Sequence, residues 1–225
     1  MEGIGIAGSG RVARSFAARL SDAGISAATF GLATPDGGGE RTQRAAQRFA
    51  AGLRTLILVP ADIAETEALL FEEQAFARNA KSLGAIVIAA TLSPRYVRAL
   101  RGRIDARITL IDAPVIGTGR AADDGRLTMF LGGPLDVIQS LKPVFDLLTR
   151  KTVRMGGFGS AMAAKVMNDF LAATNNAVTR IALDWAEAQG IDEARIVEMA
   201  GRGGEGSEAP DDAPTFCPIG QQTED

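Results

Sequence analysis

The sequence predicts an α/β fold, a Rossmann-like doubly wound and mostly parallel sheet followed by a long interdomain helix that begins a helical domain. Three observations predict it: short apolar runs alternate with helical patterns, a glycine-rich turn follows the first run, and one late helical pattern is unusually long. Apolar runs of roughly four to eight residues between helices are typical of buried parallel strands.

The apolar runs define the expected strands, which cover residues 3–8, 26–30, 54–59, 84–89, 107–111 and 127–131. Between them, apolar residues recur at helical spacing, and several segments begin beside a Gly, Asp or Pro start signal. These segments predict helices over residues 12–23, 40–53, 63–81, 94–100 and 135–148, with a short strand at 152–155.

A helical pattern without Pro or Gly runs from Ser160 to Gln189. It is far longer than the mean helix of about 11–12 residues, so we expect it to leave the sheet domain near residues 156–159. Gly190 stands where a C-terminal cap belongs, and Asp192 can start a further helix. Residues 201–225 are rich in Gly, Pro and acidic residues and predict a disordered tail.

Composition excludes several classes of function. The 225 residues carry 24 Lys+Arg and 27 Asp+Glu, a net charge of -3 that gives no basic surface for nucleic acid. The sequence contains no histidine, which removes Ser-His and Cys-His nucleophiles and the usual zinc sites. Proton transfer would fall to Lys, Asp, Glu or Tyr, and we expect no metal site.

Cellular context is suggested by cysteine use and by apolar run length. Cys217 is the single cysteine, so no internal disulfide can form and a reducing compartment is expected. No apolar run approaches the roughly 20 residues that span a bilayer, and the first residues lack a basic signal region. We therefore expect a cytoplasmic protein that does not bind membranes.

A glycine turn after the first expected strand predicts a dinucleotide site. It fits the pattern G-x-G-x-x-A and consists of Gly8, Ser9, Gly10, Arg11, Val12 and Ala13. The first glycine permits the tight turn, the second lets the backbone approach a pyrophosphate, and the following helix begins with unpaired N–H groups. The alternative is a purely structural turn.

The choice between NAD and NADP depends on the end of the second strand. An acidic residue usually binds the ribose 2'-hydroxyl of NAD there, but this strand ends in Thr29-Phe30-Gly31-Leu32. The missing carboxylate removes repulsion against a 2'-phosphate, and Arg41 lies downstream, which slightly favours NADP. Arg41 is equally well interpreted as a solvated charge at a helix start.

Two further segments carry a family resemblance. One runs from Asp112 to Thr118 and continues through the stretch 124–133; the other is Gly157-Phe158-Gly159-Ser160, which leads to Lys165. With the glycine turn, they resemble the β-hydroxyacid dehydrogenase family, which includes 3-hydroxyisobutyrate dehydrogenase, tartronate semialdehyde reductase and, more distantly, 6-phosphogluconate dehydrogenase. The resemblance implies an NAD(P)-binding domain over 1–157 and the start of a dimerising helical domain over 158–200, truncated before the tail.

The resemblance assigns catalysis to Lys165, the lysine of the interdomain helix. Elementary chemistry agrees, because oxidising an alcohol requires a base for the hydroxyl proton and the reverse reaction requires an acid. Asn168 and Asp169 follow on the same helix face and are candidate substrate-binding residues. The family has asparagine where this chain has Asp169. The alternative is an exposed helical Lys–Asp pair.

Further site residues also follow from the resemblance. The family's substrate loop reads Asp-Ala-Pro-Val-Ser-Gly-Gly; here the serine is Ile116, Gly117 is retained, and Thr118 replaces the last glycine. A plain strand-to-loop turn is the alternative. Val59, Pro60 and Thr91 follow the third and fourth strands and are expected to line the cofactor cleft.

The predicted function is an NAD(P)-dependent oxidoreductase that transfers a hydride between nicotinamide and a small 3-hydroxy acid or related carbonyl compound. One alternative is a non-catalytic NAD(P)-binding or interaction protein, because the helical domain is shortened. The other is an imine-reductase-like enzyme, although Lys165 argues mildly against it.

Overall fold

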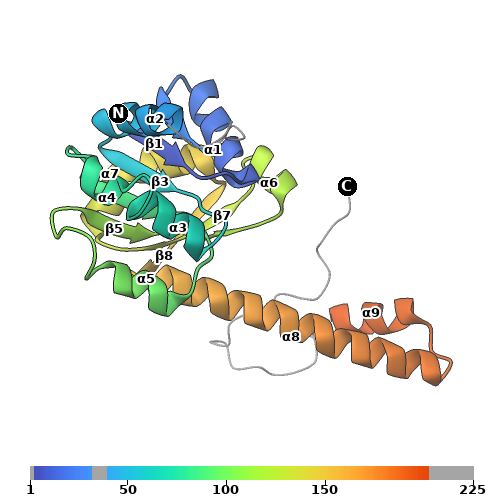
Figure 1. The fold of residues 1–225 in the computed structure, drawn as a ribbon. Helices are drawn as coiled ribbons and strands as arrows, with labels where there is room; N and C mark the ends of the chain where they lie inside the picture. The colour runs from blue at the N-terminus through green and yellow to red at the C-terminus, as the bar shows by residue number, and fades with distance from the viewer. Residues whose placement is uncertain (1–2, 32–39, 203–225) are drawn as a thin grey trace. The chain divides into compact units, whose positions relative to one another are not determined.

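A computed structural model of the chain describes residues 3–31 and 40–202 (Figure 1). The chain divides into two compact units, Met1–Val166 and Met167–Asp225. The first unit contains a sheet with helices on both faces, and the second contains most of α8 (Ser160–Ala188) and all of α9 (Glu193–Arg202). The predicted α/β class with a C-terminal helical region is thus confirmed.

The described residues form one sheet of eight strands. They are β1 (Ile4–Ala7), β2 (Ala27–Phe30), β3 (Thr55–Leu58), β4 (Ala85–Ile88), β5 (Thr109–Asp112), β6 (Val115–Ile116), β7 (Thr128–Gly132) and β8 (Lys151–Gly156). Their order is β2-β1-β3-β4-β5-β7-β6, with β8 paired to β7. The strands from β2 to β5 are parallel, and β7 is antiparallel to β5 and β6.

Helices cover both faces of this sheet, which makes it doubly wound (Figure 1). They are α1 (Arg11–Asp22), α2 (Glu40–Ala51), α3 (Ile63–Leu70), α4 (Phe76–Asn79), α5 (Pro94–Leu100), α6 (Gly119–Asp123) and α7 (Leu135–Leu148). Neighbouring strand residues point to opposite faces, so Leu56 packs with α2 to α5 and Ile57 with α1, α6 and α7. The two apolar clusters form the core.

The single helix predicted over 63–81 was wrong, because the structure has two short helices there. α3 ends at Leu70, and Ala75, with φ 47, precedes α4 in the left-handed conformation. The break turns Phe76 into the core, where it is 0% exposed and packs edge-on against Phe30 with ring centroids 5.2 Å apart. Burying an aromatic ring outweighs the lost helical turn.

The long helix predicted over 160–189 is confirmed as α8. It ends as predicted at Gly190, with φ +72, where the N–H of Ile191 bonds to the carbonyl of Ala186 at 2.9 Å. In the second unit, α8 exposes large apolar side chains, namely Met167, Phe170, Leu171, Val178, Ile181 and Trp185. α9 extends to Arg202, and the rest of the predicted tail lies outside the described residues.

Candidate active site

The predicted glycine turn joins β1 to α1 at the carboxyl edge of the sheet. Gly8 has φ +144, and a Cβ there would lie 2.1 Å from the carbonyl oxygen of Val59. Gly10 is the N-cap of α1, and a Cβ on it would meet no atom within 4 Å. Gly8 therefore lets two strand ends approach closely, whereas Gly10 borders open space before the first helical turn.

This open space has the properties that a pyrophosphate needs. The first turn of α1 leaves backbone N–H groups unpaired, carries the positive end of the helix dipole and contains no acidic residue. Gly10 borders it, and Gly8, Ser9, Arg11 and Val12 are the neighbours of Gly10 in the chain. The geometry fits the phosphates of a dinucleotide, as the sequence predicts.

Two arginines flank the turn in different ways. The Arg11 guanidinium turns away to α6, where its Nε donates to Asp123 at 3.0 Å, and this bond holds the pKa of Asp123 below its usual range. Arg14 instead donates from Nη1 to the carbonyl oxygen of Ser9 at 3.0 Å. The side chain of Arg11 thus links α1 to α6. For the cofactor contact predicted for Arg11, this leaves the backbone N–H of the residue.

The residues after β3 and β4 lie at the same edge of the sheet as the glycine turn. The N–H of Val59 donates to Ala7 at 2.8 Å, and Pro60 is buried beside it. Thr91 follows β4 and is exposed. Dinucleotides bind in open α/β sheets where strand order reverses, outside the carboxyl ends of the strands, and β1 with β3 forms that point here.

The basis for an NADP preference is only partly described. β2 ends at Phe30 without a carboxylate, and Gly31 follows it. Residues 32–39 and the side chain of Arg41 lie outside the described part of the chain. The preference for NADP therefore stays a prediction.

The predicted substrate loop lies beside the glycine turn. A Cβ on Gly119, the first residue of α6, would lie 2.9 Å from Arg11 Cδ, so the segment after β6 meets the start of α1. Gly117 has φ +138, and Thr118 caps α6 by accepting a hydrogen bond from the Ala121 N–H at 3.2 Å. Ile116 is half-buried in β6. The Thr118 oxygen thus accepts one hydrogen bond and its hydroxyl hydrogen can still be donated, while the positive φ of Gly117 sets the course of the backbone.

Lys165 lies in the first turns of α8, and this part of α8 is fixed by Asp112. The Asp112 carboxylate is buried at the end of β5 and accepts hydrogen bonds from the N–H groups of Gly159 at 2.7 Å and Met162 at 2.6 Å. Burial raises the pKa of this carboxyl. Lys165 follows Met162 by three residues and is half-exposed.

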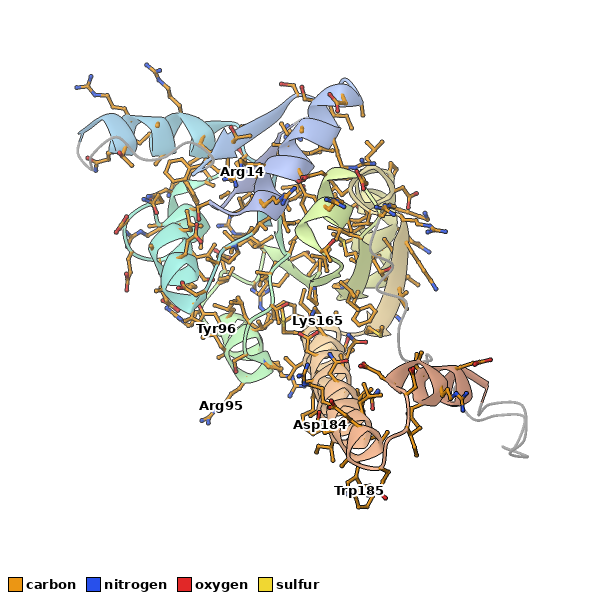
Figure 2. All side chains as sticks on the ribbon, turned by 90° about the vertical axis from the view of Figure 1, so that its right-hand side faces the viewer. Arg14, Arg95, Tyr96, Lys165, Asp184 and Trp185 are labelled. Carbon is orange, nitrogen blue, oxygen red and sulfur yellow. The ribbon has the colours of Figure 1, made fainter. Side chains whose placement is uncertain are left out.

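The start of α8 also meets the loop after β4. The N–H of Leu92 donates to the sulfur of Met162 at 3.2 Å, one residue after Thr91. Figure 2 shows Lys165 at this end of α8. Within the first unit, the structure therefore brings the Thr91 loop and the segment of Lys165 together. Asn168 and Asp169 lie further along α8, exposed, in the second unit.

Sequence reasoning named Asp112 only as the start of the substrate-loop segment and missed its contact with α8, and it missed Arg14 and Asp123 altogether. Asp112 and Met162 are 50 residues apart, so their contact has no local signature. Arg14 has a detectable signal, since a basic residue one turn into the helix after a glycine turn can reach back to that turn.

The first unit therefore has the fold of a dinucleotide-binding domain, because a strand-order reversal and a glycine turn at a helix N-terminus lie at one edge of a mostly parallel sheet. Residues 3–157 match the family described as the NAD binding domain of 6-phosphogluconate dehydrogenase. The chain belongs to this family, within the predicted β-hydroxyacid dehydrogenases.

A curated relative agrees with this membership, and two solved structures share the fold. The chain is 31% identical over 147 residues to the 2-hydroxy-3-oxopropionate reductase of Escherichia coli K12, a match that covers 62% of this chain and 48% of the reductase. The structure of Mycobacterium tuberculosis 3-hydroxyisobutyrate dehydrogenase with L-serine superposes with TM-score 0.77 at 20% identity, covering 90% of this chain and 70% of that chain. An imine reductase of Streptomyces aurantiacus superposes with TM-score 0.71 at 16% identity, covering 91% and 73%.

The chain spans about half the length of the curated relative from Escherichia coli. Among the described residues, no helix is long and apolar enough to cross a membrane. The same residues contain no group of three or more His, Cys, Asp or Glu side chains placed to hold a metal ion.

Proposed function

We propose that the protein is an NAD(P)-dependent oxidoreductase that acts on a small 3-hydroxy acid or a related carbonyl compound. The observation that carries this proposal is the placement of Lys165 on the helix segment that Asp112 fixes to β5, beside the loop after β4. Family membership supports the nicotinamide cofactor, and the glycine turn offers the matching backbone cradle.

Different residues of the first unit would bind the cofactor and transfer the proton. The backbone of Gly8 to Val12 would bind the pyrophosphate, and Val59, Pro60 and Thr91 would line the cleft for the rest of the cofactor. Bound nicotinamide supplies or accepts the hydride. Lys165 would take the substrate hydroxyl proton during oxidation and return it to the carbonyl oxygen during reduction.

The substrate's anionic end is assigned to the loop after β6. Gly117 would bind it through backbone groups, and the Thr118 hydroxyl, whose oxygen accepts the capping hydrogen bond of α6, would donate its hydrogen to it. Ile116 replaces the family's serine and gives this loop an apolar side chain. On the resemblance alone, Asn168 and Asp169 are assigned to orienting the substrate.

The proposal also includes the type of cofactor, the oligomeric state and the cellular location of the protein. NADP is favoured over NAD because no carboxylate ends β2. A homodimer through the helical domain is supported by the apolar side chains that α8 exposes in the second unit. A cytoplasmic location is supported by the single cysteine of the chain.

The decisive experiment compares Lys165→Ala with Lys151→Ala, a control at an exposed lysine in β8. Each protein is titrated with NADPH and NADH by fluorescence and assayed with a panel of hydroxy acids, aldehydes and cyclic imines. We expect Lys165→Ala to keep cofactor binding and to lose turnover of hydroxy acids by about 100-fold or more. Lys151→Ala should retain both.

Other outcomes distinguish the alternatives. Full turnover by Lys165→Ala would refute the role of Lys165. Cofactor binding without turnover of any compound by the unmutated chain would support a non-catalytic binding protein. Reduction of imines in preference to carbonyl compounds would support an imine reductase, a reading favoured only by the similarity of fold.

A further inference from the structure

A concave region lies at the amino edge of the sheet, opposite the glycine turn. It is a cavity of about 450 Å³ lined by the end of α3, by α4 and by the segments that precede β4 and β5. Leu83 comes two residues before β4, and Ile108 comes directly before β5. Because these strands are parallel, Thr91 and Asp112 lie at their other ends. The cavity is therefore separate from the candidate active site.

The floor of this cavity is apolar and well packed. Phe71 and Ala77 are partly exposed on it, and beneath them Leu70, Ala80, Leu83, Ile104 and Ile108 have exposed fractions of 0–6%. Side chains packed this tightly into the core keep their positions, so the hollow is formed before a ligand arrives. A floor of this kind accommodates the hydrocarbon part of a small molecule.

The rim of the cavity is strongly basic. Arg78, Lys81, Arg103 and Arg107 line it, and Asp105 is the one acidic residue among the lining residues. Four positive charges stand against Asp105 and against Glu67, which pairs with Arg103, so the local balance is +2, whereas the whole chain carries -3. The rim thus forms a positive region on an acidic protein and attracts anions.

Arg103 is held in place on this rim. Its guanidinium donates two hydrogen bonds to Glu67, at 2.6 Å and 2.7 Å, and its Cζ lies 3.9 Å from the centre of the Phe71 ring. Tyr96 also donates to Glu67, at 2.7 Å. The aromatic ring and the guanidinium plane present a fixed surface against which a flat group can stack.

The charges on the rim are only partly neutralised within the protein. Glu67 pairs with Arg103, and Asp105 pairs with Arg107 at 2.9 Å. Within residues 3–31 and 40–202, no ion pair involves Arg78 or Lys81. Two cations therefore remain available beside an apolar floor and a stacked arginine.

We propose that this cavity binds a small phosphate monoester with an apolar or aromatic organic part. The phosphate would lie between Arg78 and Lys81, since both side-chain types donate several charge-assisted hydrogen bonds to phosphate oxygens. The organic part would lie on the floor near Phe71. The cavity volume falls within the roughly 300–1,000 Å³ typical of small-molecule sites.

The test uses the full chain labelled with ¹⁵N and titrated with phenyl phosphate, followed by amide chemical shifts. We expect saturable shifts at Leu83, Ile104 and Ile108, at least tenfold weaker binding of inorganic phosphate, and no binding of phenol. Shifts confined to the glycine turn would overturn the proposal. Benzoate binding as tight as phenyl phosphate would overturn the choice of phosphate.

A matched pair of double variants tests which positive charges bind the phosphate. Arg78→Gln/Lys81→Gln removes the two available cations, and Arg150→Gln/Lys151→Gln removes two exposed cations next to and within β8. The first variant should bind phenyl phosphate at least tenfold more weakly, and the second should bind it like the unmutated chain. Equal losses in both variants, or none in either, would refute a specific site.

The outcome is independent of the proposed oxidoreductase function. NADPH binding is measured on the same samples, and we expect Arg78→Gln/Lys81→Gln to leave it unchanged. Phenyl phosphate binding at this cavity in a chain that does not bind NADPH would support this site and contradict the proposed function.

Discussion

The buried carboxylate of Asp112 accepts a hydrogen bond from the backbone N–H of Met162 at 2.6 Å and so ties the end of β5 to the first turn of α8. The N–H of Gly159 donates to the same carboxylate at 2.7 Å. A Cβ on Gly132 would lie 2.2 Å from Asp112 Oδ1, so the neighbouring strand must carry glycine there. One side chain thus connects the strand before the substrate loop to the helix of Lys165.

We expect Asp112→Ala to lower the free energy of unfolding by about 3 kcal/mol, because it removes two charge-assisted hydrogen bonds and leaves two buried N–H groups unpaired. Asp112→Asn should cost less, since its amide oxygen can still accept one bond. Urea denaturation at neutral pH measures both. Asp22→Ala, at the exposed end of α1, is the control and should change stability little. Equal stability of Asp112→Ala and the control would contradict the anchoring role.

The contrast between Asp112 and the glycine turn shows what the sequence can predict. The turn, the buried strands and α8 were predictable because each is encoded by residues close together in the chain. The Asp112–Met162 bond was not, because it depends on how elements 50 residues apart pack. The break before Phe76 was missed for the same reason, because it lets Phe76 pack against Phe30 and Phe49, which come from other elements.

Substitutions at Gly8 and Gly10 should affect different properties, namely stability at Gly8 and cofactor binding at Gly10. Gly8→Ala places a Cβ 2.1 Å from the Val59 carbonyl at φ +144, so we expect a loss of about 3 kcal/mol or more in unfolding free energy. Gly10→Ala meets no protein atom and should fold normally, but its methyl group enters the space assigned to the pyrophosphate. We expect at least tenfold weaker NADPH binding in a fluorescence titration.

The control for this pair is Gly24→Ala. Gly24 also has positive φ, at +73, but a Cβ on it would meet nothing within 4 Å. This variant should cost only about 1–2 kcal/mol from backbone strain and should bind NADPH normally. If Gly10→Ala binds NADPH as well as Gly24→Ala does, the pyrophosphate does not lie at the glycine turn.

Glu67 should make stability depend on pH. Hydrogen bonds from Arg103, and a weaker one from Tyr96, hold the pKa of Glu67 below its usual value. A carboxylate with a lowered pKa in the folded state stabilises the protein above its unfolded-state pKa, and this contribution is lost as pH falls through the folded-state pKa. Stability should therefore decline on the acid side of the usual glutamate range.

The test compares Glu67→Gln with Glu72→Gln, a control at an exposed glutamate after α3. Because the Glu67–Arg103 pair is partly exposed, we expect Glu67→Gln to cost about 1 kcal/mol or less at pH 7 and almost nothing near pH 3. Urea denaturation at both pH values measures the difference. A loss of unfolding free energy that is the same at pH 7 and pH 3 would show that the carboxylate charge contributes nothing to stability.

Ile116 should control which substrates the proposed enzyme accepts. Val115 packs against the core, whereas Ile116, its neighbour in β6, belongs to neither apolar cluster of the described residues. Ile116→Ser should therefore lower the unfolding free energy by about 1 kcal/mol or less, and Val115→Ser should lower it by about 1–2 kcal/mol. The new hydroxyl can bond to a substrate carboxylate, which is worth about tenfold in kcat/KM for small polar hydroxy acids. Steady-state kinetics with a graded series of substrates tests this. If Ile116→Ser leaves the preference between small polar and larger apolar substrates unaltered, the loop after β6 does not contact the substrate.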